Sequence, residues 1–322
     1  MFKWTKLGKV FSPQEVAGRP WLKEFAQAPA TLMLDDVVRV YFSCRPPADA
    51  SGLYVSYSAY VDLDRKNLFQ IRDVAKEPIL DLGGTGEFDE FGTYPVSVIR
   101  DGSNVRAYYG GWTRCESVPF NVGIGCAISR DGGRRFRKLG RGPVLPYSPD
   151  EPFILSGPKI RRFSGTWYLF YIAGRKWKMV DGRAEPVYKI RLATSTDGVR
   201  WTKANRDLIE SRIEDDEAQA SPDVFYHGGK YHMFFCYRYS ERFRSKSRGY
   251  RIGYAASRNL IDWERDDSRA GIDISAHGWD DEMVSYPHVF EVDGQIYLAY
   301  LGNEVGRHGF GIARLGDYRE NS

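Results

Sequence analysis

The stretch YPHVFEV, residues 286–292, is the last of five similar runs in which a proline opens an apolar segment. The other four are APATLML (28–34), YPVSVIR (94–100), GPKIRRF (157–163) and SPDVFYH (221–227). The prolines are spaced by 66, 63, 64 and 65 residues: Pro29, Pro95, Pro158, Pro222 and Pro287. A period of this length along the whole chain predicts a repeat architecture with one supersecondary unit per repeat.

Each repeat shows the pattern of four short strands. An aromatic residue follows every proline by thirteen positions, within a second apolar run: Phe42, Tyr108, Tyr171, Phe235 and Tyr300. Turn sequences such as RDGSN, FSGT, HGGK and VDGQ separate the two runs and favour tight hairpins. A third run follows, for example YRIGYAAS (250–257), and then a fourth that begins at an aromatic residue. Four consecutive antiparallel strands are the unit of a propeller blade.

The beginning of the chain supplies the strand that the last repeat lacks. Repeats one to four have an aromatic residue at the start of the fourth strand, and repeat five has none: Phe69, Phe136, Trp201 and Trp263. Trp4, in KWTKLGKV, stands in register, 65 residues before Phe69. We therefore predict an all-β, five-bladed β-propeller with four antiparallel strands per blade, a single domain over residues 1–322 whose N-terminal strand closes the fifth blade. A β-sandwich or two smaller β domains would not require five equal repeats.

Composition and charge narrow the range of partners. The 322 residues carry a net charge of +4 without a long Lys/Arg block, so we expect no nucleic acid partner. The N-terminus lacks the apolar segment of a signal peptide and no run reaches the length of a membrane span, which predicts a cytoplasmic protein without a membrane partner. The four cysteines and five histidines lack CxxC and HExxH spacing, so we expect reduced thiols, no metal and no cofactor. The sequence does not indicate an oligomeric state.

Carboxylates precede most of the inner strands. The loop that enters strand one and the loop between strands two and three lie at the same end of an antiparallel blade, so both meet at one mouth of the propeller. Four glutamates stand five positions before a proline: Glu24, Glu90, Glu217 and Glu282. Paired carboxylates in an enclosed site suit acid and base catalysis on glycosidic bonds. The candidate catalytic residues are Glu90, Glu217, Glu282, Asp89 and Asp281. Alternatively, such carboxylates accept backbone N–H bonds or pair with arginines.

One arginine per repeat follows the second strand and should reach the same mouth: Arg45, Arg114, Arg175, Arg238 and Arg307. Guanidinium groups bind phosphate and carboxylate through paired hydrogen bonds. Nearby aromatic residues offer flat faces for sugar rings: Tyr94, Tyr286, Trp112 and Trp177. We predict these nine residues, together with His308, as substrate-binding residues. Asp131 and Asp197 lie at the opposite end, where we expect them to form turns.

The proline-opened repeats and the turns SRDGGRRF (129–136) and STDGVRW (195–201) resemble those of the five-bladed propeller glycosidases and phosphorylases of glycoside hydrolase families 43, 32, 68 and 130. The segments GEFDEFGTYPVSVI, ASPDVF, GWDDEMVSYPHVF and GRHGFGIA are similar to those of propeller proteins from bacterial polysaccharide gene clusters. One departure concerns the catalytic Asp that families 32 and 43 carry where the first inner strand opens, often directly before a proline. The residues before the prolines here are Ala28, Tyr94, Gly157, Ser221 and Tyr286. Phosphorylases of family 130 use one acidic residue together with basic residues that bind phosphate. The arginine set fits this pattern better than the Asp triad of families 32 and 43.

The resemblance implies an enzyme that cleaves or transfers a glycosyl group, a glycoside hydrolase or phosphorylase, and the arginines indicate an acidic or phosphorylated sugar. Glu217 or Glu90 is the expected general acid, and Glu282 or Asp281 the base or positioning group. Since the standard Asp triad is missing, a non-catalytic propeller that binds an acidic sugar or sugar nucleotide is the alternative. A sialidase-like enzyme is a third, suggested by SRDGGRRF and the arginines. Five repeats rather than six, and no export signal, count against it.

Overall fold

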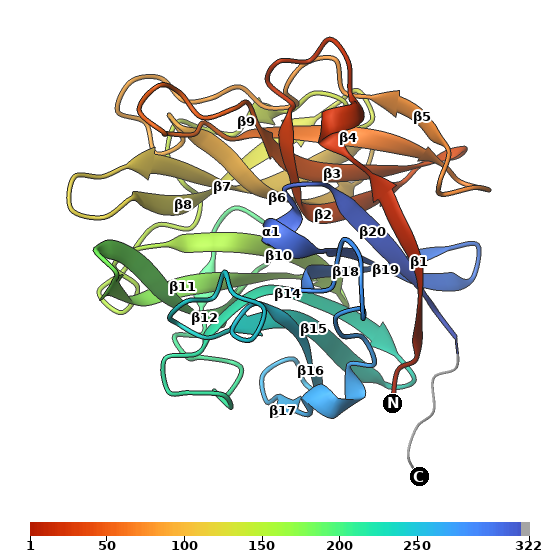
Figure 1. Ribbon diagram of the computed structural model, residues 1–322. Helices are drawn as coiled ribbons and strands as arrows, with labels where there is room; N and C mark the ends of the chain where they lie inside the picture. Colours follow the sequence, from red (N-terminus) through yellow and green to blue (C-terminus); the bar gives the residue numbers. More distant parts are fainter. Residues whose placement is uncertain (317–322) are drawn as a thin grey trace.

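Five four-stranded antiparallel sheets surround a central axis in the computed structural model (Figure 1). The structure describes residues 1–316; the last six residues, to which the single-domain prediction extends, lie outside the described residues. The prediction of a five-bladed β-propeller with almost no helix is confirmed. No helix within residues 1–316 has the length and apolar composition that a bilayer crossing requires.

In each blade the inner strand lies at the axis and the other three follow outward. Blade 1 contains β2 (Glu24–Met33), β3 (Val37–Arg45), β4 (Tyr57–Asp64) and β5 (Ile71–Val74). Blade 2 contains β6 (Gly92–Asp101), β7 (Asn104–Arg114), β8 (Phe120–Ser129) and β9 (Arg137–Lys138). Blade 3 contains β10 (Leu155–Phe163), β11 (Thr166–Val180), β12 (Arg183–Ser195) and β13 (Thr202–Lys203). Blade 4 contains β14 (Ala218–His227), β15 (Lys230–Arg238), β16 (Arg251–Ser257) and β17 (Glu264–Arg265). Blade 5 contains β18 (Ser285–Val292), β19 (Gln295–Leu301), β20 (Phe310–Leu315) and β1 (Trp4–Phe11). The short helical turns are η1 (Pro13–Glu15), η2 (Asp267–Arg269) and α1 (Asn303–Gly306).

The first strand of the chain closes the ring, as predicted. β1 pairs antiparallel with β20, and Trp4 lies opposite Leu315. The Trp4 indole also donates a hydrogen bond to the Ala270 carbonyl, 3.0 Å away, in the neighbouring blade. Both chain ends therefore contribute to blade 5, and that sheet gains a fourth strand over the edge of β20.

The tight hairpins between first and second strands form where the turn sequences predicted them. The two loop residues of the β18–β19 hairpin, Asp293 and Gly294, have φ values of 50° and 81°. Ser164 and Gly165 of the β10–β11 hairpin have φ values of 47° and 85°. Positive φ at both central positions is the type I′ geometry that matches the twist of a two-stranded ribbon.

The repeated prolines lie inside the inner strands rather than at their first residues, which corrects the expected strand starts. The strands begin two to five residues earlier, and the pairing register shifts at every proline. A β-bulge leaves one residue without a ladder partner, so it accommodates a residue that has no N–H to donate. The positive φ values of the residues before the prolines, such as 52° at Ser221 and 51° at Tyr286, belong to this bulge.

The contacts between blades involve the second-strand aromatics and the SxDG turns. All five aromatic residues thirteen positions after a proline are fully buried. Tyr108 is one of these five residues, and its hydroxyl donates to the Gly198 carbonyl in the turn of the next blade, 2.6 Å away. Asp197 accepts the backbone N–H groups of Val199 and Arg200, both at 2.8 Å. Asp131 makes the equivalent bonds in blade 2, so the expectation that both aspartates form turns is confirmed.

Polar side chains of the inner strands meet in the centre of the ring. Asp223 accepts the backbone N–H of Val289 at 2.6 Å, across the boundary between blades 4 and 5. His288 Nε2 accepts the N–H of Thr31 at 2.9 Å, across the boundary between blades 5 and 1. Inner strands are sheet edges whose backbone groups face the axis, and these side chains satisfy them.

A buried acid and cation connect the loop before the inner strand to the outer strand in four blades. The pairs are Asp89–Lys138 (2.6 Å), Glu151–Lys203 (2.7 Å), Glu217–Arg265 (2.6 Å) and Asp280–Lys6 (2.7 Å). Second-strand tyrosines donate to three of these acids: Tyr109 to Asp89, Tyr171 to Glu151 and Tyr300 to Asp280. Each pair therefore holds an entering loop against the outer edge of its own blade.

Replacing Glu217 should destabilise the protein. The carboxylate is fully buried and also accepts hydrogen bonds from Gln219 (2.8 Å) and the Arg212 backbone (3.0 Å). Glu217→Gln removes one of the two carboxylates that pair with the buried Arg265 guanidinium, the other being Asp267 at 2.8 Å, and this loss costs roughly 1–3 kcal/mol of unfolding free energy. Urea unfolding measures this loss. The matched control is Glu90→Gln, because Glu90 accepts only the Gly86 N–H in an exposed loop; equal losses in both variants would refute the distinction.

Lowering the pH from 6.5 to 4 should also destabilise the folded protein. Burial lowers the pKa of the His288 imidazole from 6.5 to about 4, with Asp223, Lys159 and Arg161 facing it. Within this window the unfolded chain takes up a proton at His288 and the folded protein does not, so the free energy of unfolding falls by about 3 kcal/mol between pH 6.5 and pH 4. Unfolding curves measured at several pH values test this. His288→Gln should show a smaller slope; identical slopes would contradict the assignment.

Candidate functional site

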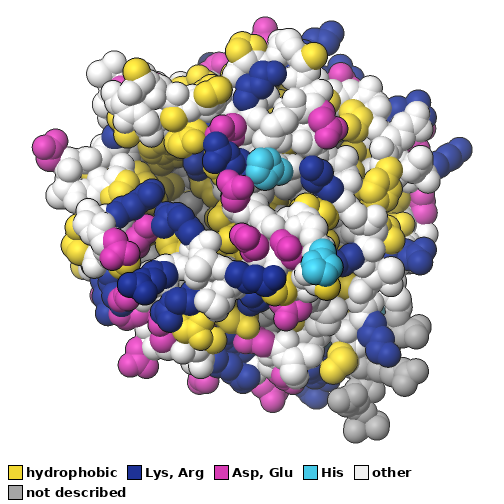
Figure 2. All heavy atoms as spheres, in the orientation of Figure 1, with side chains coloured by type: hydrophobic (Ala, Val, Ile, Leu, Met, Phe, Trp, Pro, Cys, Tyr) yellow, Lys and Arg dark blue, Asp and Glu magenta, His cyan; other side chains and the backbone are white. Residues whose placement is uncertain are grey.

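All five blades line a cavity of about 360 Å³ at one end of the axis. The end is the one at which the loops entering the inner strands meet the loops between the second and third strands. Figure 2 shows this face hollowed, with Lys and Arg side chains gathered around the hollow. The cavity is therefore the place where the arginines and aromatic residues predicted from the repeats could meet a ligand.

The residues before the prolines form the floor of the cavity. Tyr94, Gly157, Ser221 and Tyr286 all line it. The hydroxyls of Tyr94 and Tyr286 lie 3.0 Å apart, so the phenols of blades 2 and 5 meet over the axis. Burial raises the pKa of both phenols, which therefore stay neutral at physiological pH. Two of the positions directly before a repeated proline thus provide neutral hydroxyls to the cavity floor.

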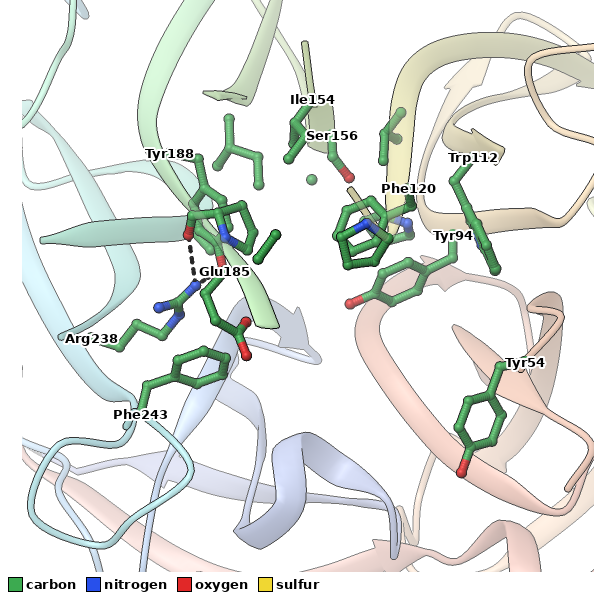
Figure 3. Close-up of a pocket in the computed structure, with 18 of the residues that line it drawn as sticks. Tyr54, Tyr94, Trp112, Phe120, Ile154, Ser156, Glu185, Tyr188, Arg238 and Phe243 are labelled. Atoms are coloured by element: carbon green, nitrogen blue, oxygen red, sulfur yellow. Dashed lines mark hydrogen bonds between the residues drawn. The ribbon is translucent and has the colours of Figure 1, made fainter. Parts of the chain in front are cut away.

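Aromatic side chains form two facing walls (Figure 3). Tyr54, Trp112 and Phe120 lie on one side, and Tyr188 and Phe243 lie on the other. The indole of Trp112 packs over the backbone of Gly92, where a Cβ atom would come within 1.7 Å of the ring nitrogen. A glycine at position 92 is therefore required for this wall.

Five arginines line the cavity: Arg45, Arg114, Arg183, Arg238 and Arg244. Arg45 donates to Ser56 Oγ at 3.1 Å, and its guanidinium lies 4.6 Å from the centre of the Phe25 ring. Arg114 donates to the Tyr54 carbonyl at 3.0 Å and has Asp49 at 3.8 Å. The cavity is therefore strongly cationic.

Glu185 is the one carboxylate among the described residues that lines the cavity. It is 6% exposed, and its Oε1 atom pairs with Arg244 at 2.7 Å and with Arg183 at 3.5 Å. Glu185 follows the turn between β11 and β12, which are 15 and 13 residues long and extend past the other blades' strands. Lys178 of this hairpin donates to Ser240 at 3.1 Å, which joins it to the loop that carries Phe243 and Arg244.

Sequence reasoning missed Glu185 because the search followed positions shared by the repeats. The residue belongs to an extension that only repeat three has, so no register position marks it. The turn sequence VDGR at 180–183, between two long apolar runs, was the signal that could have located the hairpin. Arg183 lies on the same extension, and Phe243 and Arg244 lie in the loop between β15 and β16, where no register position marks them either. Tyr188 begins the third apolar run of repeat three, YKIRLATS, but nothing in that run indicates that its side chain reaches the cavity.

The five predicted catalytic carboxylates do not line the cavity. Glu217 and Asp89 are buried in the acid and cation pairs described above. Glu90 caps its own loop, and the Glu282 side chain is exposed. Asp281 accepts a hydrogen bond from Asn303 at 2.8 Å, which lowers the pKa of its carboxyl. The structure therefore does not bring these groups together, and their catalytic roles stay predictions.

The predicted substrate-binding residues divide into two groups. Six line the cavity: Arg45, Arg114, Arg238, Tyr94, Tyr286 and Trp112. The other four do not. Arg175 pairs with Asp207, and Arg307 pairs with Glu24 at 2.9 Å. His308 Nε2 lies 3.2 Å from the Glu304 carboxylate on the surface. Trp177 packs edge-on against Phe120, with 5.6 Å between ring centres, behind the cavity wall.

The fold is similar to solved propeller enzymes. A structure described as "Glycoside hydrolase" superposes with a TM-score of 0.76 at 16% identity, covering 100% of this chain and 94% of that chain. A thermostable family-43 glycoside hydrolase superposes with a TM-score of 0.65 at 15% identity, covering 95% of this chain and 91% of that chain. The β-1,2-mannobiose phosphorylase of Listeria innocua superposes with a TM-score of 0.68 at 10% identity, covering 97% of this chain and 96% of that chain. These similarities confirm that the chain has the propeller fold of the glycosidases and phosphorylases it was expected to resemble.

Sequence comparison identifies close relatives but no matching family profile. Two proteins of Mycobacterium tuberculosis, described as uncharacterized proteins MT1551 (strain CDC 1551 / Oshkosh) and Rv1502 (strain ATCC 25618 / H37Rv), are each 35% identical over 313 residues. The alignment covers 97% of this chain and 99% of each relative. The chain therefore belongs to the same family as these two mycobacterial proteins.

Proposed function

We propose that this protein is a carbohydrate-active enzyme that transfers the glycosyl group of an anionic sugar, and that the axial cavity is its active site. The observation that carries the proposal is the lining of that cavity, in which aromatic walls enclose five arginines and a single carboxylate. The glycosidase and phosphorylase fold supports the carbohydrate class, although fold alone does not define a substrate.

The aromatic walls suit a sugar ring. The C–H groups on the face of a pyranose pack on flat rings such as those of Trp112, Tyr54 and Tyr188, while hydroxyls at the floor can bond to Tyr94 and Tyr286. A cavity of about 360 Å³ is at the lower end of the range for small-molecule sites, so it suits one or two sugar units. The arginines would hold a phosphate or carboxylate of the same ligand.

The single carboxylate favours phosphate over water as the attacking group. Hydrolysis with paired carboxylates requires a second acid about 5–10 Å from the first, and within residues 1–316 only Glu185 lines the cavity. In phosphorolysis an oxygen of inorganic phosphate attacks the anomeric carbon, and the glycosidic C–O bond breaks with its electron pair passing to the leaving oxygen. Inorganic phosphate that enters as the monoanion would take over contacts of Arg183 and Arg244 and leave one proton on the Glu185 carboxylate. Glu185 then gives this proton to the leaving oxygen.

A second candidate function is binding of an anionic sugar without bond cleavage. The observation in its favour is the pairing of Glu185 with Arg183 and Arg244, which occupies the one carboxylate that lines the cavity among the described residues. In this case the cavity would recognise its ligand with the same arginines and aromatic rings.

Phosphate release from glycosyl 1-phosphates should reveal the proposed activity. A panel of these donors is incubated with sugar acceptors, and free phosphate is measured with time. We expect release with at least one donor, and Glu185→Gln should lower turnover by about 10²–10⁴-fold because the proton transfer is lost. Thermal unfolding of the variant checks that it is folded. Glu77→Gln, on an exposed surface ion pair with Arg135, is the control and should match the unmodified protein.

The same assay separates the alternatives. Loss of activity in Glu282→Gln or Asp281→Asn but not in Glu185→Gln would support the carboxylates predicted from the sequence and refute the role of Glu185. Cleavage of oligosaccharides that is independent of phosphate would show hydrolysis. Saturable binding of sugar phosphates with no product from any donor would support the non-catalytic function.

A further inference from the structure

Two of the cavity arginines occupy the same repeat position on opposite sides of the axis. Arg45 and Arg238 each follow their proline by sixteen residues and end the second strand of blades 1 and 4. Blade 5 separates these blades on one side and blades 2 and 3 on the other, which is the largest separation that a five-bladed ring allows. The two side chains therefore approach the cavity from different walls.

Arg238 is a buried charge without an acidic partner among the described residues. It is 1% exposed and donates only to neutral oxygens, at 3.1 Å to the Tyr250 hydroxyl, 3.0 Å to the Pro186 carbonyl and 2.9 Å to the Tyr239 carbonyl. Its guanidinium lies 3.7 Å from the centre of the Phe243 ring. Burying a charge without an opposite charge is costly, so a bound anion would relieve this site.

Arg45 is in a similar situation on the other wall. Its described partners are the Ser56 hydroxyl at 3.1 Å and the Gln27 side-chain oxygen at 3.5 Å, both neutral. The rings of Phe25 and Tyr54 lie 4.6 and 5.2 Å from the guanidinium and limit its access to water. The carboxylate of Glu24, at the start of the same blade, is already paired with Arg307.

A row of neutral phenols lies between the two arginines. Tyr94, whose ring lies 5.7 Å from Arg45, meets the Tyr286 hydroxyl at 3.0 Å. Tyr286 packs edge-on against Tyr250, with ring centres 6.1 Å apart, and the Tyr250 hydroxyl contacts Tyr188 at 2.6 Å beside Arg238. No carboxylate interrupts this row within the described residues. Figure 3 shows Arg238 and Phe243 on one side of the cavity and Tyr54 and Trp112 on the other.

We propose that the cavity takes a doubly anionic sugar, with one anionic group at Arg45, the other at Arg238, and the neutral ring over Tyr94 and Tyr286. This inference rests on the proposed function, because it specifies the ligand of the same site. Two separated cations over a neutral floor match two separated anions better than a single one, since each guanidinium gains a charge-assisted hydrogen bond. Arg114 and Arg244 line the same cavity but have acidic partners, Asp49 at 3.8 Å and Glu185 at 2.7 Å, so Arg45 and Arg238 are the cations that a ligand has to balance.

Calorimetric titration with a matched set of sugars tests the proposal. The probes are glucose, glucose 1-phosphate, glucose 6-phosphate and glucose 1,6-bisphosphate, which differ only in the number and place of anions. We expect the bisphosphate to bind at least tenfold more tightly than either monophosphate, and glucose to bind most weakly. Arg45→Gln and Arg238→Gln should each reduce bisphosphate affinity to the monophosphate level, and each should weaken a different monophosphate.

The controls separate binding from folding. Arg135→Gln removes an exposed, ion-paired arginine far from the cavity and should leave all four affinities unchanged. Arg238→Lys keeps the charge but loses the planar fork, so it should retain part of the bisphosphate preference even if Arg238→Gln fails to fold.

Two results would overturn the proposal in different ways. If the bisphosphate binds within threefold of the better monophosphate, or if only one arginine matters for both phosphates, the double-anion inference fails and the anionic-sugar function stands. If glucose binds as tightly as its phosphates, or if none of the four probes binds, the anionic character of the site fails as well.

Discussion

The hydrogen bonds between inner strands around the axis are the contacts on which this propeller depends. Five sheet edges converge there, and their backbone groups are out of reach of bulk water. Side chains of one inner strand therefore bond to the backbone of the next, as Asp223 does to Val289, His288 to Thr31 and Ser97 to Ile160. Lys159 and Arg161 balance the Asp223 charge, and together with His288 they hold the pKa of this fully buried carboxyl well below its usual range. The ring has a polar centre, and this centre lies next to the cavity floor.

The bulge at each proline connects the fold to the site. Because the register shifts there, the residue before the proline faces the cavity and the residue after it faces the polar centre, as Ser221 and Asp223 show. Substitutions at the positions before the prolines therefore change the chemistry of the cavity floor without changing the strands of the blades. In this chain two such positions are tyrosines whose hydroxyls meet, and the floor offers neutral hydrogen bonds where an acid would introduce a charge.

The sequence predicted the architecture, because it follows from the repeat. Of the ten residues predicted to bind substrate, six reach the cavity, since the repeat places the ends of the second strands and the residues before the prolines at this end of the axis. It could not predict which acids face inward. Glu217 and Asp89 stand beside the inner strands in sequence, yet their side chains turn outward to Arg265 and Lys138 on the outer strands. Such pairs join residues nearly fifty positions apart, and no local pattern reveals them. Glu185 was missed because it lies on an extension that the other repeats lack.

Taken alone, the sequence determined the number of blades, the closure by β1 and the end of the axis at which arginines gather. These follow from periodicity and strand direction, which are local properties of the chain repeated five times. Only the tertiary structure decided that the cavity is cationic rather than acidic. Its charge depends on which side chains find partners across a blade, and the buried acids are neutralised there while Arg45 and Arg238 are not. Pairing of this kind is a property of three-dimensional packing, so the repeat positions alone cannot specify it.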